Sequence, residues 1–366
     1  LSTAAIREQA GKQEALWAAL SQVIDEIREE RFEPGIYYDA KENPVEFSSV
    51  LLTMYNDMER KPYDSISQVL QAYYAAKNRN SRIHQKSSDL RRIVSTALER
   101  TAKKYDLQRG QLKDTEKRDK YRIYGELLNT YGYEIETGAK SATVMNYYTN
   151  EELTIPLDET LTPVDNSKKY FVRYNKLKRT YEALTEQLQQ TEQELRHLQS
   201  IQTALDIAQE EADLADIKRE LMEYGYIRFK SEGKKKGKPE KSKPLHYISS
   251  DGYHIYVGKN NYQNEELTFK VANGADLWFH AKQTPGSHVI VKTEGAAEIP
   301  DATYEEAGRL AAYYSSAKTG TKVDVDYTRR SNLKKTPGGA PGFVIYHTNY
   351  SMTVEPDIRG IQEING

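Results

Sequence analysis

The sequence predicts a multidomain α+β protein in which two long antiparallel helical arms precede a C-terminal domain of strands and one helix. The length of 366 residues is usual for two or three domains. Hydrophobic residues make up 38% and charged residues 29%, which suits long exposed helices better than one compact globule. Strand-like segments are concentrated after a lysine-rich stretch near residue 240.

The first 76 residues alternate between helical and extended patterns. Apolar residues recur at helical spacing from Thr3 to Arg31, before Pro34-Gly35 ends the pattern. Short strands with an intervening turn are predicted at residues 35–50, and a second helix at Asp64 to Ala76. Because the first residue is Leu rather than Met, we expect the chain to be part of a longer protein.

The arms are predicted from heptad spacing over residues 77–230. On the outgoing arm, Ile83, Leu90 and Ala97 recur every seven residues. Spacing that alternates between three and four residues marks the return arm at Tyr174, Leu177, Tyr181, Leu184, Leu188, Thr191, Leu195, Leu198, Gln202 and Leu205. Between the arms, residues 133–157 have alternating polarity, so we expect an antiparallel coiled coil with a small β tip.

Charge differs between the two arms. Lys77 to Arg122 contains 15 Lys/Arg and 6 Asp/Glu, whereas Lys168 to Glu223 contains 9 and 11. A local basic excess is the electrostatic footprint of a surface that faces phosphates, although a solvated helix face has the same composition.

A basic linker separates the arms from the last domain. Residues 231–243 are rich in lysine and glycine with no apolar anchor, which is typical of a flexible connection. In residues 244–366, one helix is predicted from a Thr303-x-x-Glu306 capping box to near Gly320. The strand-like runs are YHIYVG, ELTFKVA, DLWFHAK, SHVIV, KVDVDYT, GFVIYHT and SMTVEP.

Residues 276–295, DLWFHAKQTPGSHVIVKTEG, concentrate the residue types that carry chemistry. A zinc site is disfavoured because the chain has no cysteine, no HExxH motif and no common ligand spacing among its histidines. A hydrolytic site at Asp276, His280 and Ser287 is disfavoured because no helix follows the Pro-Gly turn. No catalytic residue, cofactor or metal is therefore expected. The absence of a long apolar run also argues against membrane insertion.

A strand at 276–282 has two faces. Asp276, Trp278, His280 and Lys282 point to one side, while the apolar Leu277, Phe279 and Ala281 point to the other. A hairpin loop with an odd number of residues pairs His280 with His288, and an even one does not. A polar and aromatic face of this kind suits single-stranded RNA, whereas in the alternative interpretation Trp278 fills a core and the charges are solvated.

The predicted RNA interface combines this face with nearby loops and the basic arm. Lys259 to Asn261 are expected on a loop that extends the surface, and Lys334 and Lys335 on another. The candidate RNA-binding or ribosome-binding residues are Arg91, Arg92, Lys103, Lys104, Lys259, Asn260, Asn261, Asp276, Trp278, His280, Lys282, Ser287, His288, Lys334 and Lys335.

Several motifs in the same order resemble one family. VGKNNYQNEELTFKVANGADLWFHAKQTPGSHVIV, AAYYSSAK, VDYT and PGGAPGFVIYH resemble the NFACT-R domain. DKYRIYGELL and YYTNEELTIPLD resemble the middle of bacterial RqcH/FbpA proteins, relatives of eukaryotic NEMF. The resemblance covers essentially the whole chain.

The resemblance implies a cytoplasmic ribosome quality-control factor that is not itself an enzyme. Such proteins bind obstructed large ribosomal subunits (rRNA) with peptidyl-tRNA and recruit alanyl-tRNA for alanine tailing. Residues 1–76 would then be helix-hairpin-helix-like, with remnant strands of NFACT-N. Most of NFACT-N, with its Asp-Arg pair, would be missing, so no tailing is expected from this chain alone.

The family is also described as surface adhesins that bind fibronectin or fibrinogen. This gives an alternative function, although no LPxTG-type sorting sequence follows residues 359–366, so surface display would need an unconventional route.

Overall fold

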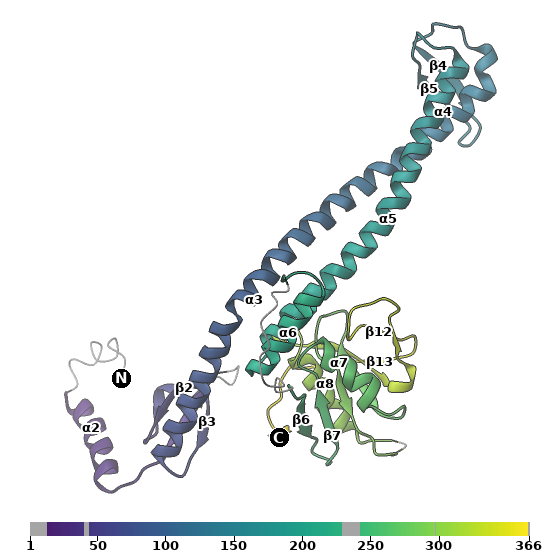
Figure 1. Cartoon of the computed structure of the whole chain (residues 1–366). Helices are drawn as coiled ribbons and strands as arrows, with labels where there is room; N and C mark the ends of the chain where they lie inside the picture. The colour runs from purple at the N-terminus through teal and green to yellow at the C-terminus, as the bar shows by residue number, and fades with distance from the viewer. Residues whose placement is uncertain (1–12, 40–43, 229–241, 297, 365–366) are drawn as a thin grey trace. The chain divides into compact units, whose positions relative to one another are not determined.

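The computed structural model describes residues 13–39, 44–228, 242–296 and 298–364. It confirms the α+β class, because long helices precede a large antiparallel sheet (Figure 1). The chain forms two compact units. The first unit comprises Leu1–Asp89, Ala208–Ala215 and Lys238–Ser242, and the second comprises Leu90–Ile207, Asp216–Gly237 and Lys243–Gly366. The predicted linker at 231–243 lies outside the described residues up to residue 241.

The first unit is built on a three-stranded antiparallel sheet. Helix α2 (Gln13–Arg28) comes first, and the strands are β1 (Gly35–Tyr38), β2 (Pro44–Ser48) and β3 (Glu59–Pro62) in the order β2-β1-β3. Ile36 of the central strand is buried against Val69 and Tyr73 of α3 (Ile66–Asp114). The segment expected to resemble a helix-hairpin-helix therefore has strands between its helices, and α3 continues without a break past residue 76.

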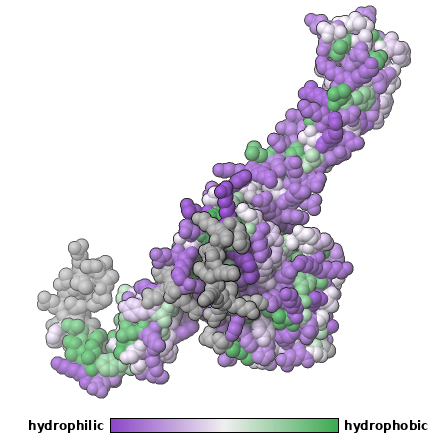
Figure 2. Space-filling model, in the orientation of Figure 1, coloured by the Kyte–Doolittle hydropathy of each residue, from purple (hydrophilic) through white to green (hydrophobic). Residues whose placement is uncertain are grey.

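The arms of the second unit are α3 from Leu90 onward and α5 (Pro163–Ile207), joined through a compact tip (Figure 1). The tip contains α4 (Arg118–Tyr131) and a hairpin of β4 (Ser141–Asn146) and β5 (Glu151–Pro156), which lies inside the predicted 133–157 element. Leu127, Leu128 and Ile155 form its core. The visible surface along the arms is mostly hydrophilic, with scattered hydrophobic groups (Figure 2).

The buried positions of the arms follow the heptad spacing only in part. On α5, Leu184, Thr191, Leu198 and Leu205 are buried at intervals of seven residues. Gln202 was expected in the same seam but is exposed, and Ile201 is buried in its place. A straight helix has 3.6 residues per turn and so drifts away from a strict 3.5-residue repeat, which explains a change of one position. On α3 the buried seam includes polar side chains at Thr101 and Gln108, and the buried Thr115 follows directly after the helix.

Replacement of glycine by alanine should have opposite effects on the free energy of unfolding at two helical positions. A Cβ on Gly125 of α4 would lie 2.8 Å from the Phe171 ring, whereas a Cβ on Gly110 of α3 would meet no atom of the described residues within 4 Å. Gly125→Ala should therefore lower the free energy of unfolding by about 1–3 kcal/mol through overpacking. Gly110→Ala should raise it by about 0.5–1 kcal/mol through helix propensity. Urea unfolding followed by circular dichroism distinguishes the two signs, and shifts of the same sign would contradict this packing.

The C-terminal domain is a seven-stranded antiparallel sheet in the order β13-β10-β8-β9-β7-β6-β14. Its strands are β6 (Leu245–Ile248), β7 (His254–Val257), β8 (Leu277–Ala281), β9 (Val289–Val291), β10 (Val323–Arg329), β13 (Tyr350–Val354) and β14 (Gln362–Glu363). Helix α8 (Asp301–Tyr313) covers one face, where Leu310 and Ala311 share a core with Phe279 and Val289. A separate ribbon of β11 (Lys334–Lys335) and β12 (Val344–Ile345) completes the domain.

Two segments of this domain differ from the secondary structure predicted for them. ELTFKVA is not a strand but the end of helix α7 (Asn261–Glu266) and a π-helical turn at Leu267–Val271. The physical reason is the Asn260 cap, whose side chain accepts a hydrogen bond from the Gln263 amide and so starts a helix. The capping box at Thr303 is also absent from the described helix, which begins two residues earlier at Asp301. The Thr303 hydroxyl instead donates to the Asp251 carboxylate at 2.8 Å.

Candidate nucleic-acid interface

Trp278 lies in a second hydrophobic core and not on an open surface. The alternation in β8 is as predicted, because Leu277, Phe279 and Ala281 join the core beneath α8. The side of β8 with Trp278 is also covered, by residues of the π-helical turn, of β9 and of the chain around the β11–β12 ribbon. These residues include Leu267, Ile290, Leu333 and Tyr346. Trp278 is only 1% exposed, so its predicted role as a stacking platform for RNA bases is wrong.

His280 and His288 meet across the hairpin. Trp278 pairs with Ile290 and Phe279 with Val289, the register of an odd-numbered loop, and the two imidazole rings lie 5.4 Å apart edge to face. Burial lowers the pKa of His288 well below its ordinary value of 6.5, and His280 lowers it further. Burial also lowers the pKa of His280. His288 is buried and bonded to the Thr268 hydroxyl at 2.7 Å, so this pair is held neutral inside the domain.

The lowered pKa values of this pair predict that the domain loses stability in mild acid. Below the ordinary histidine pKa of 6.5, the unfolded chain binds protons that the folded pair does not. Stability therefore falls as the pH drops from 6.5 toward the lower folded pKa values. The melting temperature should decrease between about pH 7.5 and about pH 5.5, and His288→Gln should reduce that decrease. His347→Gln, which replaces an exposed histidine, is the control. A decrease unchanged in His288→Gln would contradict this origin.

Asp276 is a buried structural carboxylate. It accepts hydrogen bonds from the amides of Asn273 at 2.8 Å and Thr293 at 3.0 Å, and it forms an ion pair with Lys292. Burial tends to raise the pKa of Asp276, but the bonds from Lys292 and the amides outweigh it and hold the pKa below its ordinary value of 3.8. Its predicted contact with RNA is therefore wrong, because the carboxylate is occupied in holding two loops together.

The other polar residues predicted on a surface loop are also buried. Lys259, Asn260 and Asn261 are each 5% exposed or less, and Ser287 is 1% exposed. Asn260 caps α7, and the side-chain amide of Asn261 donates to the Glu220 carboxylate at 2.8 Å and to the Ser200 hydroxyl at 2.9 Å. The loop expected on the surface at residues 259–261 is therefore buried. Helix α7 turns this segment inward, against α5 and the end of α6 (Glu211–Glu223).

Among the residues of the C-terminal domain that were predicted to bind RNA, the exposed cations are Lys282, Lys334 and Lys335. Lys282 is exposed and donates to the Ser351 hydroxyl at 3.1 Å, while His280 is half-buried. Lys334 and Lys335 are exposed on the β11–β12 ribbon, where Lys335 pairs with Glu265 at 2.8 Å. The structure does not bring these side chains together with Trp278 as one open face.

On the arm, the predicted basic residues separate into two groups. Arg91 is half-buried and pairs with Asp206 of α5, so it joins the two arms. Arg92, Lys103 and Lys104 are exposed on α3. Arg100 lies on the same side and was not among the predicted residues, although its i, i+4 spacing from Lys104 is visible in the sequence. We call Arg92, Arg100, Lys103 and Lys104 the basic face of α3.

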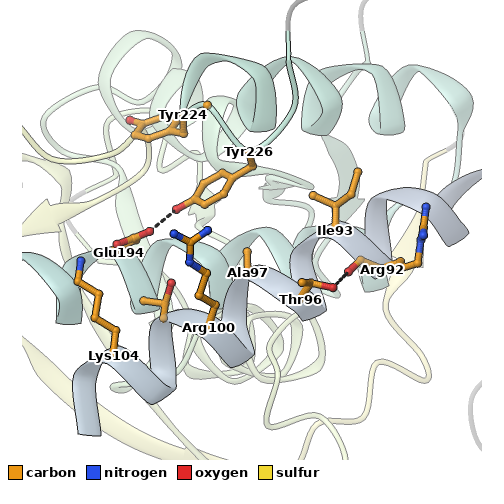
Figure 3. A pocket seen from close by; sticks show the side chains of 11 residues that line it. Arg92, Ile93, Thr96, Ala97, Arg100, Lys104, Glu194, Tyr224 and Tyr226 are labelled. Carbon is orange, nitrogen blue, oxygen red and sulfur yellow. Dashed lines mark hydrogen bonds between the residues drawn. The ribbon is translucent and has the colours of Figure 1, made fainter. Parts of the chain in front are cut away.

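Part of the basic face lines a pocket of about 810 Å³ (Figure 3). Arg92, Thr96, Arg100 and Lys104 contribute from successive turns of α3, Glu194 contributes from α5, and Tyr224 and Tyr226 from the chain after α6. The guanidinium of Arg100 points toward Tyr226 in Figure 3, and Lys104 extends toward Glu194. The Tyr226 hydroxyl donates to Glu194 at 3.2 Å. Burial and this carboxylate raise the pKa of Tyr226, which keeps it a neutral donor.

The charge of the pocket favours anions at its α3 edge. Arg100, Lys103 and Lys104 form no ion pair with any carboxylate in the described part of the chain. Three cations line the pocket against the single carboxylate of Glu194. Proteins that bind single-stranded nucleic acids combine cations, which contact the backbone, with aromatic rings on which bases stack.

Two other features are absent from the part of the chain that the structure describes. Within the described ranges, no three histidine or acidic side chains lie close enough together to hold a metal ion. Among the helices that the structure describes, none has the length and hydropathy needed to cross a bilayer.

Comparisons with known proteins match most of the chain. Residues 2–240 match the model for NFACT N-terminal and middle domains, and residues 243–347 match that for the NFACT protein RNA binding domain. The chain is similar to the "Rqc2 homolog RqcH" of Streptococcus pneumoniae strain D39, with 39% identity over 303 residues, covering 82% of this chain and 54% of the relative. For that of Bacillus subtilis the identity is 36% over 342 residues, covering 93% and 59%. The chain thus spans little more than half the length of these relatives.

A solved structure gives an independent match. The C-terminal part of the fibronectin/fibrinogen-binding protein from Streptococcus suis is 34% identical, with a TM-score of 0.59, and the match covers 75% of this chain and 96% of that one.

Proposed function

Because the chain belongs to the NFACT family, we propose that it is part of a cytoplasmic ribosome quality-control factor that binds RNA of obstructed large ribosomal subunits. Within the whole protein it would support alanine tailing, with peptidyl-tRNA and alanyl-tRNA as further partners. The chain acts in this proposal as a binding factor and not as an enzyme.

The observation that supports this proposal best is the basic face of α3. Arg100, Lys103 and Lys104 have no carboxylate partner among the described residues, so their charge is available to a polyanion. Burying such charges against phosphate releases condensed counterions, which gives affinity without sequence readout. The C-terminal domain, which matches an RNA-binding family model, supplies Lys282, Lys334 and Lys335 as additional contacts.

Co-sedimentation with purified ribosomal subunits tests the proposal. The chain should pellet with large subunits in preference to small subunits, and the affinity should fall steeply as salt is raised. A pull-down from native lysate with the full-length protein should recover large subunits together with tRNA. Equal binding to both subunits, or an affinity insensitive to salt, would contradict the proposal.

A second candidate function is binding to fibronectin or fibrinogen. It is favoured by the similarity to the Streptococcus suis protein, whose name includes these ligands. Purified chain should then bind immobilised fibronectin or fibrinogen saturably, and the binding should persist in moderate salt. Unsaturable binding, or binding lost in moderate salt, would contradict this second function.

A further inference from the structure

We propose that the pocket between α3 and the Tyr224–Tyr226 segment binds one unpaired nucleotide of RNA, with its phosphate at Arg100 and Lys104 and its base against Tyr224. The inference rests on the proposed function, because it identifies which part of an RNA the basic face of α3 recognises.

The phosphate side of the pocket is formed by two cations one helical turn apart. Arg100 and Lys104 are four residues apart on α3, so their Cα atoms are separated by about 6 Å along the helix axis. Both side chains are exposed, and neither has a carboxylate partner within the described residues. A backbone phosphate can therefore contact either or both without displacing an existing ion pair.

The base side of the pocket is formed by Tyr224. Its ring packs against the buried imidazole of His197 at a centroid distance of 4.2 Å, while 43% of the residue remains exposed. Tyr224 is one of the residues that line the pocket (Figure 3). An exposed ring that is already fixed on one side can stack a base at a smaller entropic cost than a freely rotating one.

A buried polar network holds this ring in place from behind. His197 Nε2 lies 2.8 Å from Glu220 Oε1, and the same oxygen accepts a bond from Asn261 at 2.8 Å. Glu220 is 0% exposed and His197 is 4% exposed. The network links α5, α6 and α7, so the position of Tyr224 is determined by three packed helices.

The third wall distinguishes a nucleotide from a bare phosphate. Glu194 repels phosphate, but its carboxylate, which already accepts from Tyr226, can accept hydrogen bonds from base amino groups or from a 2′-hydroxyl. The pocket thus has a cationic edge on α3 and an acceptor edge on α5. Its volume of about 810 Å³ lies within the usual range for small-ligand pockets of about 300–1,000 Å³.

Duplex RNA fits this arrangement poorly. Its bases are stacked inside the helix and cannot present a face to Tyr224, whereas unpaired bases in loops and single strands can. We therefore expect the chain to bind single-stranded RNA more tightly than double-stranded RNA, and we expect this difference in affinity to depend on Tyr224.

Fluorescence anisotropy of the full chain tests this with three probes: an unstructured RNA oligonucleotide, a duplex of that strand, and inorganic polyphosphate. Tyr224→Ala should weaken binding of the single strand by about 5- to 150-fold, the effect of one lost stacking contact, and change duplex and polyphosphate binding by less than about twofold. Tyr224→Phe keeps the ring and should bind the single strand like the unmodified chain. Tyr133→Ala removes an 82% exposed tyrosine at the tip and is the matched control.

The outcomes separate this inference from the proposed function. If large subunits bind but Tyr224→Ala affects all three probes equally, or none, the nucleotide pocket is wrong and the proposed function stands. If the unmodified chain binds no large subunits, the proposed function fails whatever the pocket does. Melting curves check that Tyr224→Ala is folded. If it is not, Arg100→Gln with Lys104→Gln must weaken single-strand binding, and unchanged single-strand binding would overturn the inference.

Discussion

Replacing Trp278 with alanine is expected to lower the free energy of unfolding of the C-terminal domain by about 3–5 kcal/mol. The indole is 1% exposed and packs with Leu267, Ile290 and Leu333, so its removal leaves a cavity between the sheet and the α7 segment. Urea unfolding followed by circular dichroism measures the loss without relying on the fluorescence of the deleted residue.

The chain provides its own control in its other tryptophan. Trp17 of α2 is 67% exposed, and Trp17→Ala should change the free energy of unfolding by less than about 0.5 kcal/mol. If Trp278→Ala were as mild as Trp17→Ala but abolished RNA binding, Trp278 would be a surface contact and the core described for this face would be wrong.

Reversing the charge of Arg100 and Lys104 together is expected to weaken binding to large ribosomal subunits by more than about tenfold near 0.1 M salt. Each lost phosphate contact removes one released counterion, so the plot of log affinity against log salt should also become less steep by about two. Co-sedimentation of Arg100→Glu/Lys104→Glu over a salt series measures both quantities.

The return arm provides the matched control for this charge reversal. Lys176 and Lys178 are exposed on α5, away from the basic face of α3. Lys176→Glu/Lys178→Glu makes the same change in net charge, so it tests whether position matters or only total charge. Equal weakening by both double variants would mean that binding follows net charge and that the α3 site is not specific.

The sequence alone predicted the structure correctly where a local pattern of residues determines it. Heptad spacing predicted α5 because one buried stripe is enough to orient a long helix. The alternation of polar and apolar residues at 276–282 predicted β8 and its two faces, because successive side chains of a strand point to opposite sides. Leu277, Phe279 and Ala281 were correctly assigned to the core, since their apolar side chains lie on one side of the strand and need cover.

The errors arose where distant segments determine the outcome. Alternation shows on which side of β8 Trp278 points, but not that Leu333 and Tyr346, more than fifty residues later in the chain, cover that side. The burial of Asn261 likewise depends on Glu220 of α6, which no local pattern reveals.

The pocket was missed for the same reason. Arg100 belongs to an i, i+4 series that is visible in α3, so this half could have been recognised from the sequence. Tyr224 and Tyr226 follow in the chain more than a hundred residues later, and only the fold places them opposite Arg100.

In the proposed function, the basic face of α3 contacts the RNA of large ribosomal subunits. Lysine acetylation of the full chain, read by mass spectrometry with and without bound large subunits, tests it directly. Binding should protect Lys103 and Lys104 from acetylation while Lys176 and Lys178 stay reactive. Undiminished reactivity of Lys103 and Lys104 in the bound chain would contradict the claim.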